Sequence, residues 1–146
     1  MTIKADCVIR RADLDDLPAI KKLADSHKQE LGFVRWPVLA RSIGQSEVYV
    51  AENGEGIIGF LQYHHRRDRQ TTLHNIAVRL DYRNCGIGRK MTMALEVESQ
   101  TKGKSAILLK CPEDLPANSF YAKMGYEKVN VESGKARRLN IWQKIL

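Results

Sequence analysis

The chain has 146 residues, 43% of them hydrophobic, and a formal net charge of +7. This length predicts one domain with one hydrophobic core over residues 1–146. No apolar run is long enough to cross a bilayer, and the first residues lack the apolar segment of a secretory signal. Three widely spaced cysteines predict neither a disulfide framework nor a metal site. We therefore expect a cytoplasmic protein that has no metal and makes no membrane contact.

The positive charge suits an anionic ligand or a nucleic acid. The densest basic clusters are His64–Arg69 and Lys135–Arg138. Neither has aromatic residues interleaved for base stacking, so nucleic acid is not the favoured partner. A basic surface around an anionic small ligand is the simpler interpretation.

The N-terminal part predicts a strand followed by helices. Cys7–Arg10 forms a short strand pattern. Asp13 is a suitable N-cap, and apolar residues at helical spacing continue until Gly32 ends the helix. His27 lies on this apolar stripe, where a packing residue is expected rather than a ligand. Pro37–Ile43 predicts a short second helix.

A hairpin follows. Val48–Ala51 and Gly56–Tyr63 are apolar runs that flank Asn53-Gly54, a dipeptide typical of tight hairpin turns. The two histidines after the second strand are neighbours, and neighbours on a strand point to opposite faces. They therefore do not predict a metal site, and residues 64–70 are expected to form a charged loop.

A strand, a glycine-containing loop and a helix occupy the middle of the chain. Thr71–Val78 is rich in β-branched and apolar residues, which predicts a buried strand. The loop Arg83–Gly88 follows a polar break, and residues 89–98 predict a helix that buries Met91 and Leu95. The unpaired N–H groups and positive dipole at the helix start, with two glycines before it, form a natural anion site.

This loop matches neither of two common phosphate-binding motifs. No Gly-Lys-Ser/Thr ends it, so it is not a P-loop. A third glycine and an acidic ribose ligand are missing, so it is not a dinucleotide-binding fingerprint. On the glycines alone, a tight turn without a ligand explains the loop equally well.

The C-terminal third predicts further strands around a short helix. Ser105–Lys110 is the next strand, and a proline-stiffened loop separates it from the helix Ala117–Met124. Residues 126–131 and 136–142 predict two closing strands about a turn. A hairpin, one strand–helix–strand crossover and a second hairpin together predict an α+β sandwich with a largely antiparallel sheet.

Two segments in this order resemble the GNAT superfamily of acyl-CoA-dependent N-acyltransferases, from about Glu47 onward. The family's phosphate loop, Gln/Arg-x-x-Gly-x-Gly/Ala, is matched by Arg83, Gly86 and Gly88. Its later segment, an Asn before Phe-Tyr-x-x-x-Gly-Phe/Tyr, is matched by Asn118, Phe120, Tyr121, Gly125 and Tyr126. The resemblance implies a mixed, largely antiparallel sheet of about six to seven strands with helices on both faces.

The resemblance also implies acetyl-CoA as the acyl donor and assigns residues to it. The pantetheine arm is expected along the strand residues Ile76, Ala77 and Val78. The pyrophosphate is expected at the loop and helix start, formed by Arg83, Asn84, Cys85, Gly86, Ile87, Gly88, Arg89 and Lys90. Asn118 would hold the pantetheine arm, although in many members the Asn lies further ahead, where this chain has Asp114. Tyr121 would be the general acid, because a phenol with a pKa near 10 is a proton donor at neutral pH.

The general base is not determined by the sequence. Thr72, His74 and Lys110 occupy the positions where some family members carry a Glu. Glu113 and Asp114 could act through water, and the amine could also lose its proton to solvent. Cys85 and Cys111 have no His–carboxylate partner nearby in sequence, so we expect both to be structural and transfer to be direct.

The predicted activity is therefore acetyl transfer from acetyl-CoA to a primary amine of a small molecule or a protein. Phe33 and Trp36 could contact this acceptor, although loop aromatics often only pack. One alternative is a longer acyl donor. Another is a non-catalytic GNAT-like module that binds CoA or nucleic acid. The closing strands also offer edges through which a homodimer could form.

Overall fold

The computed structural model describes residues 6–146, whose strands form one seven-stranded sheet in the order β1-β2-β3-β4-β5-β7-β6. The first four strands are antiparallel, β4 and β5 are parallel, and β5, β7 and β6 are antiparallel again. The strands are β1 (Val8–Arg11), β2 (Val48–Asn53), β3 (Gly56–His65), β4 (Gln70–Val78), β5 (Ala106–Pro112), β6 (Glu127–Ser133) and β7 (Arg138–Ile145).

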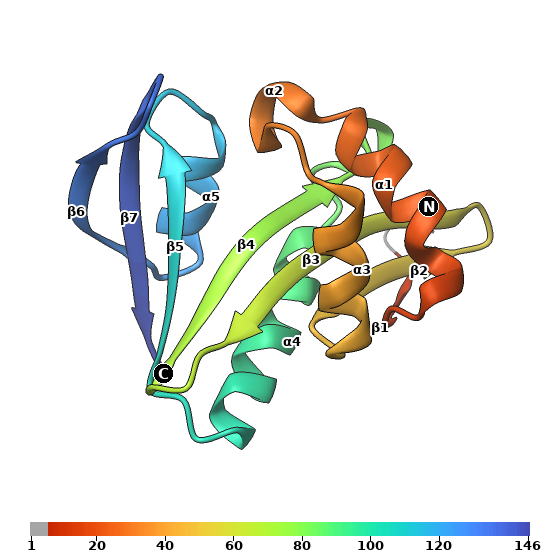
Figure 1. Ribbon diagram of the computed structural model, residues 1–146, viewed down its shortest axis with the longest axis horizontal. Coiled ribbons are helices and arrows are strands. Elements are labelled where there is room, and N and C mark those ends of the chain that lie inside the picture. Colours follow the sequence, from red (N-terminus) through yellow and green to blue (C-terminus); the bar gives the residue numbers. More distant parts are fainter. Residues whose placement is uncertain (1–5) are drawn as a thin grey trace.

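Helices cover both faces of the sheet (Figure 1). One face carries α1 (Leu17–Asp25) and α3 (Trp36–Gly44), and the other carries α4 (Ile87–Thr101) and α5 (Ala117–Lys123). The remaining elements are α2 (Lys28–Leu31) and the single turns η1 (Leu14–Asp16) and η2 (Leu80–Tyr82). The predicted α+β fold is confirmed, including the crossover β4–α4–β5.

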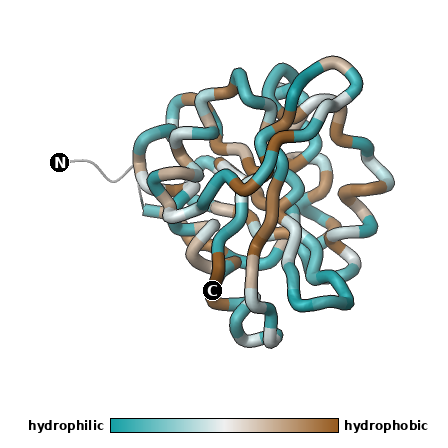
Figure 2. The backbone as a smooth tube through the Cα atoms, turned by 90° about the vertical axis from the view of Figure 1, so that its left-hand side faces the viewer, coloured by the Kyte–Doolittle hydropathy of each residue, from teal (hydrophilic) through white to brown (hydrophobic). Residues whose placement is uncertain are grey.

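Each face of the sheet has its own hydrophobic core. Met91 and Leu95 of α4 are 0% exposed, as their helical spacing predicts. Ile20 of α1 and Leu39 of α3 are the matching 0% exposed residues on the opposite face. Figure 2 shows the same arrangement along the backbone, with hydrophobic stretches through the interior and hydrophilic loops around them. Within residues 6–146, no helix combines the length and the apolarity needed to cross a membrane.

The helix predicted up to Gly32 is interrupted at Ser26 and His27. Ser26 Oγ donates to the Leu23 carbonyl at 2.7 Å, and His27 Nδ1 lies 2.9 Å from the same carbonyl. These side chains compete for a carbonyl that the helix would otherwise use, so α1 ends and α2 starts separately. His27 is 5% exposed, and its Nε2 lies 3.1 Å from the Val78 carbonyl. It is therefore a packed residue that connects the helices to β4.

Other boundaries also differ from the prediction, and the closing strands are β6 at Glu127–Ser133 and β7 at Arg138–Ile145 instead of 126–131 and 136–142. The expected loop 64–70 is shorter, because His65 pairs with Thr71 and extends both β3 and β4. β5 continues through Pro112 because it remains paired with β7. α4 begins at Ile87, two residues early, because this side chain is 1% exposed and anchors the helix start in the core.

Candidate active site

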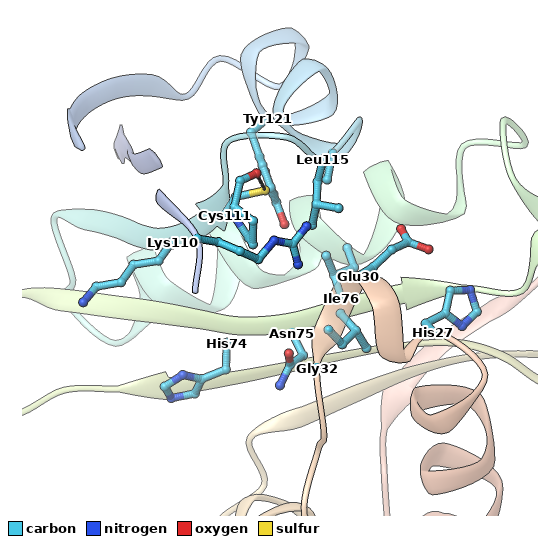
Figure 3. A pocket seen from close by; sticks show the side chains of 14 residues that line it. His27, Glu30, Gly32, His74, Asn75, Ile76, Lys110, Cys111, Leu115 and Tyr121 are labelled. Carbon is cyan, nitrogen blue, oxygen red and sulfur yellow. Dashed lines mark hydrogen bonds between the residues drawn. The ribbon is translucent and has the colours of Figure 1, made fainter. Parts of the chain in front are cut away.

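The parallel strands β4 and β5 separate soon after they pair. Only Gln70–Thr72 pairs with Ala106–Leu108, after which β4 follows β3 and β5 follows β7. Figure 1 shows β4 and β5 diverging, and a cavity of about 310 Å³ lies between them, which we call the interstrand notch. Asn75 and Ile76 of β4 lie on one side of it, and Cys111 of β5 and Tyr121 of α5 lie on the other (Figure 3).

A β-bulge places His74 at this notch. Gln62 pairs with Asn75 and Tyr63 pairs with Leu73, so His74 is the extra residue of β4. A bulge bends its strand and changes the direction in which a side chain points, and bulges are common beside active sites. Here the bulged residue lies in the wall of the notch.

The backbone of β4 beyond the bulge faces the notch at alternate residues. Arg79 donates its N–H to the Ile58 carbonyl of β3 at 2.8 Å. Backbone N–H groups point to alternate sides along a strand, so those of Ile76 and Val78 point away from β3, toward the gap where β4 and β5 diverge. Those are the groups predicted to pair with pantetheine. Ala77 is 5% exposed and packs in the core beside α1, so only its backbone is near the notch.

Arg83 is held by protein partners. Its Nε donates to the Val78 carbonyl at 3.3 Å, and its guanidinium lies 2.9 Å from a Glu30 carboxylate oxygen. The pair is partly exposed and therefore contributes little stability on its own. It does fix the position of the loop beside β4. Any contact between Arg83 and phosphate would compete with Glu30.

The loop before α4 has the backbone shape of an anion cradle. Asn84 and Gly86 have left-handed backbones, with φ of 61° and 83°, and Gly86 is the N-cap of α4. Nothing lies within 4 Å of the position where a Cβ on Gly86 would stand. At Gly88 a Cβ would stand 3.4 Å from the Phe120 ring, so this glycine allows α4 to approach α5. The helix start is therefore open to a phosphate and carries the positive end of a 15-residue helix dipole.

The other loop residues surround this cradle. Arg89 and Lys90 are exposed in the first turn of α4, where their charges can reach a bound phosphate. Cys85 is partly exposed, and its Sγ lies 3.5 Å from the Arg83 carbonyl. The structure therefore brings together the loop residues that the sequence singled out.

Tyr121 is a buried residue whose side chain lines the notch. The side chain is 5% exposed, and its ring makes edge contacts with Phe120 and Tyr126 at centroid distances of 5.5 and 5.9 Å. Among residues 6–146 its hydroxyl has no hydrogen-bond partner, although it lines the cavity. Burial raises the pKa of Tyr121 well above its ordinary value, so the phenol stays protonated. The Tyr121 hydroxyl is therefore a proton donor that is not engaged by another group among residues 6–146.

Asn118 has a different environment from the one predicted. Its Nδ2 donates to the carbonyls of Pro112 and Leu115 at 2.9 and 2.8 Å. Its Oδ1 accepts from Asn140 Nδ2 at 3.0 Å and from Trp142 Nε1 at 2.9 Å. It is not in the wall of the notch. The predicted pantetheine contact stays a prediction and would require one of these bonds to break, whereas the observed bonds fasten α5 to β5 and β7.

Cys111 is the thiol inside the notch. It is 4% exposed, and burial raises its pKa to about 11. The thiolate is the nucleophilic form of cysteine, and it is scarce at neutral pH when the pKa is this high. The geometry therefore favours direct transfer over a covalent acetyl-cysteine.

A second cavity of about 510 Å³, the α3 groove, adjoins the notch. The two cavities share Leu31, His74 and Asn75 in their walls. In the α3 groove, His64 Nδ1 lies 2.8 Å from Glu47 Oε1. The other carboxylate oxygen, Glu47 Oε2, accepts a hydrogen bond from the backbone N–H of His65 at 2.8 Å. The sequence does not indicate the pair of Glu47 and His64, because these residues are far apart in the chain. Only the pairing of β2 with β3 brings them together.

His74 is the general-base candidate at the junction of the two cavities. The side chain of His74 is exposed, but partial desolvation of the ring, together with the nearby His64, lowers its pKa, which favours the neutral imidazole at neutral pH. Two other candidates are engaged elsewhere. Lys110 Nζ lies 2.7 Å from a Glu132 oxygen, and Asp114 lies 2.8 Å from Arg137.

Comparison with known proteins agrees with this geometry. Residues 44–128 match the family model described as acetyltransferase (GNAT) domain. The [ribosomal protein bS18]-alanine N-acetyltransferase of Haemophilus influenzae is 30% identical over 108 residues, which cover 71% of this chain and 73% of that protein.

Solved structures share the fold at lower identity. Ard1 from Thermoplasma volcanium has a TM-score of 0.86 and 15% identity, covering 96% of this chain and 97% of that one. The ribosomal-protein-S18-alanine N-acetyltransferase from Escherichia coli has a TM-score of 0.80 and 19% identity, covering 96% and 94%. PaiA N-acetyltransferase from Thermoplasma acidophilum, in complex with coenzyme A, has a TM-score of 0.81 and 20% identity, covering 97% and 99%.

The fold and the notch define an acyltransferase that uses acetyl-CoA as its co-substrate and an amine as its acceptor. The chain belongs to the GNAT acetyltransferase family. The alternative of a non-catalytic binding module is therefore not favoured.

Proposed function

We propose that this enzyme acetylates the N-terminal amino group of a polypeptide by direct transfer within the interstrand notch. The observation that carries the proposal is the Tyr121 hydroxyl, a proton donor in the cavity that β4 and β5 form, with no hydrogen-bond partner among residues 6–146. The H. influenzae relative, named for an alanine of a ribosomal protein, supports a polypeptide acceptor. The open α3 groove supports it too, because it provides room for residues that follow the amine.

The chain's residues hold the donor at two places. The backbone N–H groups of Ile76 and Val78 bind the pantetheine arm as an added strand would bind. The amides between Asn84 and Arg89 bind the pyrophosphate at the start of α4, and the charges of Arg89 and Lys90 add to the attraction. Acetyl-CoA supplies an activated thioester.

Two side chains move protons during the transfer. His74 accepts a proton from the ammonium group, so that the neutral nitrogen attacks the thioester carbon. The new C–N bond forms as the C–S bond breaks, and Tyr121 donates the proton that converts the departing thiolate to a thiol. The nitrogen releases its second proton to solvent, which leaves the neutral amide. Solvent then returns a proton to Tyr121 and removes the one that His74 holds.

The experiment compares two glutamate substitutions with the same local strain. Gly86 and Gly103 have φ of 83° and 76°, and nothing lies within 4 Å of a Cβ at either position. Gly86→Glu places a negative charge at the phosphate cradle, whereas Gly103→Glu places it in the turn after α4. We expect Gly86→Glu to abolish both the rise in thermal midpoint with acetyl-CoA and peptide acetylation detected by mass spectrometry.

The Gly103→Glu variant should be destabilised similarly, because both positions require a left-handed backbone. It should nevertheless keep acetyl-CoA binding and peptide acetylation. If Gly86→Glu binds and transfers as well as Gly103→Glu, the loop before α4 is not the phosphate site. If the wild type binds acetyl-CoA but acetylates no peptide, the polypeptide acceptor is wrong.

A further inference from the structure

We infer that the α3 groove selects acceptor peptides with an acidic residue close to the N-terminus, and that Arg35 and Arg41 recognise its carboxylate. The inference rests on the proposed peptide acceptor and names its class. It concerns the side of the site that binds the acceptor, which is separate from the loop and notch that bind acetyl-CoA.

These two arginines differ from most others in the chain. Arg10, Arg11, Arg66, Arg79, Arg83, Arg137 and Arg138 each have a carboxylate oxygen within 4.0 Å. Arg35 and Arg41 have no such partner among residues 6–146, and both are exposed. Arg89, beside the phosphate cradle, has none either. Unpaired arginines thus lie where the donor's phosphates are expected and in the adjoining groove.

The helix α3 directs this charge into the groove. Val38, Arg41, Ser42 and Gln45 follow one another at i, i+3, i+4 and i+7, which puts them on one helix face, and all four line the groove. Arg35, the N-cap residue of α3, lines it as well. Both arginines therefore line the same cavity, one at the start of α3 and one in its last turn.

Among residues 6–146, one carboxylate lines the groove, and this carboxylate already has hydrogen-bond partners. Glu47 is 8% exposed and is bound by His64 Nδ1 and by a backbone N–H, both at 2.8 Å. It does not neutralise either arginine at salt-bridge distance. A carboxylate entering the groove would form charge-assisted hydrogen bonds with the arginines, whereas a lysine would meet two like charges.

The rim of the groove suits the rest of an acidic side chain. Phe33 is 71% exposed and Val38 is 48% exposed, so they offer apolar surface to methylene groups. Lys28 Nζ lies 5.8 Å from the centroid of the Phe33 ring, which adds positive charge at the entrance. Lys21 Nζ lies 4.6 Å from the same centroid but is paired with Asp25 at 2.6 Å. Apolar surface beside basic groups fits a Glu or Asp side chain.

The test uses three peptides that differ only at their second and third residues. Both positions are Glu in the first peptide, Gln in the second and Lys in the third. We expect the wild type to acetylate the Glu peptide at least about tenfold faster in kcat/KM than the Lys peptide. The preference should shrink as salt is raised, because the contacts are partly exposed. Arg35→Glu with Arg41→Glu should reverse the order of the Glu and Lys peptides.

The matched control is Arg67→Glu with Arg69→Glu. These arginines are exposed in the β3–β4 turn and have no carboxylate within 4.0 Å among residues 6–146, so the control changes the net charge equally outside the groove. It should keep the wild-type order, and both double variants should keep the stabilisation by acetyl-CoA.

Equal rates for the three wild-type peptides would overturn the inference and leave the proposed function intact. An unchanged order in the groove variant, or an equal change in the control, would also overturn it. Failure to acetylate any peptide despite acetyl-CoA binding would remove the proposed acceptor and this inference together.

Discussion

Glu98 of α4 is a charged residue in the protein interior, with 8% exposure. Its carboxylate accepts hydrogen bonds from the Tyr49 and Tyr63 hydroxyls and lies next to His65 Nε2, each at 2.7 Å, and Arg11 also binds it. Burial alone would raise the pKa of Glu98, but these partners together outweigh burial and lower it from 4.5 to about 2. The cluster connects α4 to β1, β2 and β3.

This cluster predicts how stability changes with pH. Because the folded-state pKa of Glu98 is depressed, its contribution is complete above about pH 4.5 and is lost as the pH falls toward 2. The shift corresponds to about 3 kcal/mol. Denaturant unfolding should show Glu98→Gln to be less stable than wild type near neutral pH by about 3 kcal/mol. The two curves should converge between pH 4.5 and 2, and parallel curves would contradict this account.

Asn118 is the second residue whose bonds can be tested. Asn118→Ala would leave the side-chain donors of Asn140 and Trp142 without their partner. Unsatisfied buried groups cost about 1–3 kcal/mol each, so we expect a loss of about 2–3 kcal/mol in the free energy of unfolding. Asn130→Ala is the control, because Asn130 is exposed on β6. Equal small losses in both variants would show that Asn118 does not fasten α5.

At the scale of elements, α4 is fixed at both ends relative to the sheet. Ile87, buried at 1% exposure, anchors its start, and Glu98 anchors its last turns. A fixed helix start keeps the phosphate cradle at a constant position beside the notch, and preorganised sites lose less entropy on binding.

The sequence predicted the elements whose signals are local. The Asn53-Gly54 turn, the burial of Met91 and Leu95 and the loop before α4 depend on neighbours in the chain, and the structure confirms them. The interruption at His27 was not predicted, because it depends on hydrogen bonds that the apolar stripe does not record.

The site was predictable only in part. Arg83–Gly88 and Tyr121 are predicted as site residues because their motifs are contiguous in sequence. The bulge at His74, the Glu47–His64 pair and the arginines of α3 were not found as parts of one site. Their meeting depends on strand register and on helix packing across the sheet, which a periodic pattern does not determine.

At the scale of the whole molecule, the net charge of +7 is placed unevenly. Within residues 6–146, unpaired arginines lie at the start of α4, in the α3 groove and in the β3–β4 turn. We expect the arginines at the start of α4 and in the α3 groove to attract anionic ligands and to raise their rate of association. The strands β1 and β6 are the sheet edges, and pairing of copies through them stays a prediction.

The notch as a catalytic site is tested most directly by comparing Tyr121→Phe with Tyr126→Phe. Both tyrosines are buried, and burial raises the pKa of both, but the hydroxyl of Tyr126 is enclosed and only Tyr121 lines the notch. We predict that Tyr121→Phe lowers kcat for CoA release by about 10²–10³ with unchanged stabilisation by acetyl-CoA. Tyr126→Phe should keep near wild-type kcat. Full activity in Tyr121→Phe, or equal losses in both variants, would contradict this mechanism.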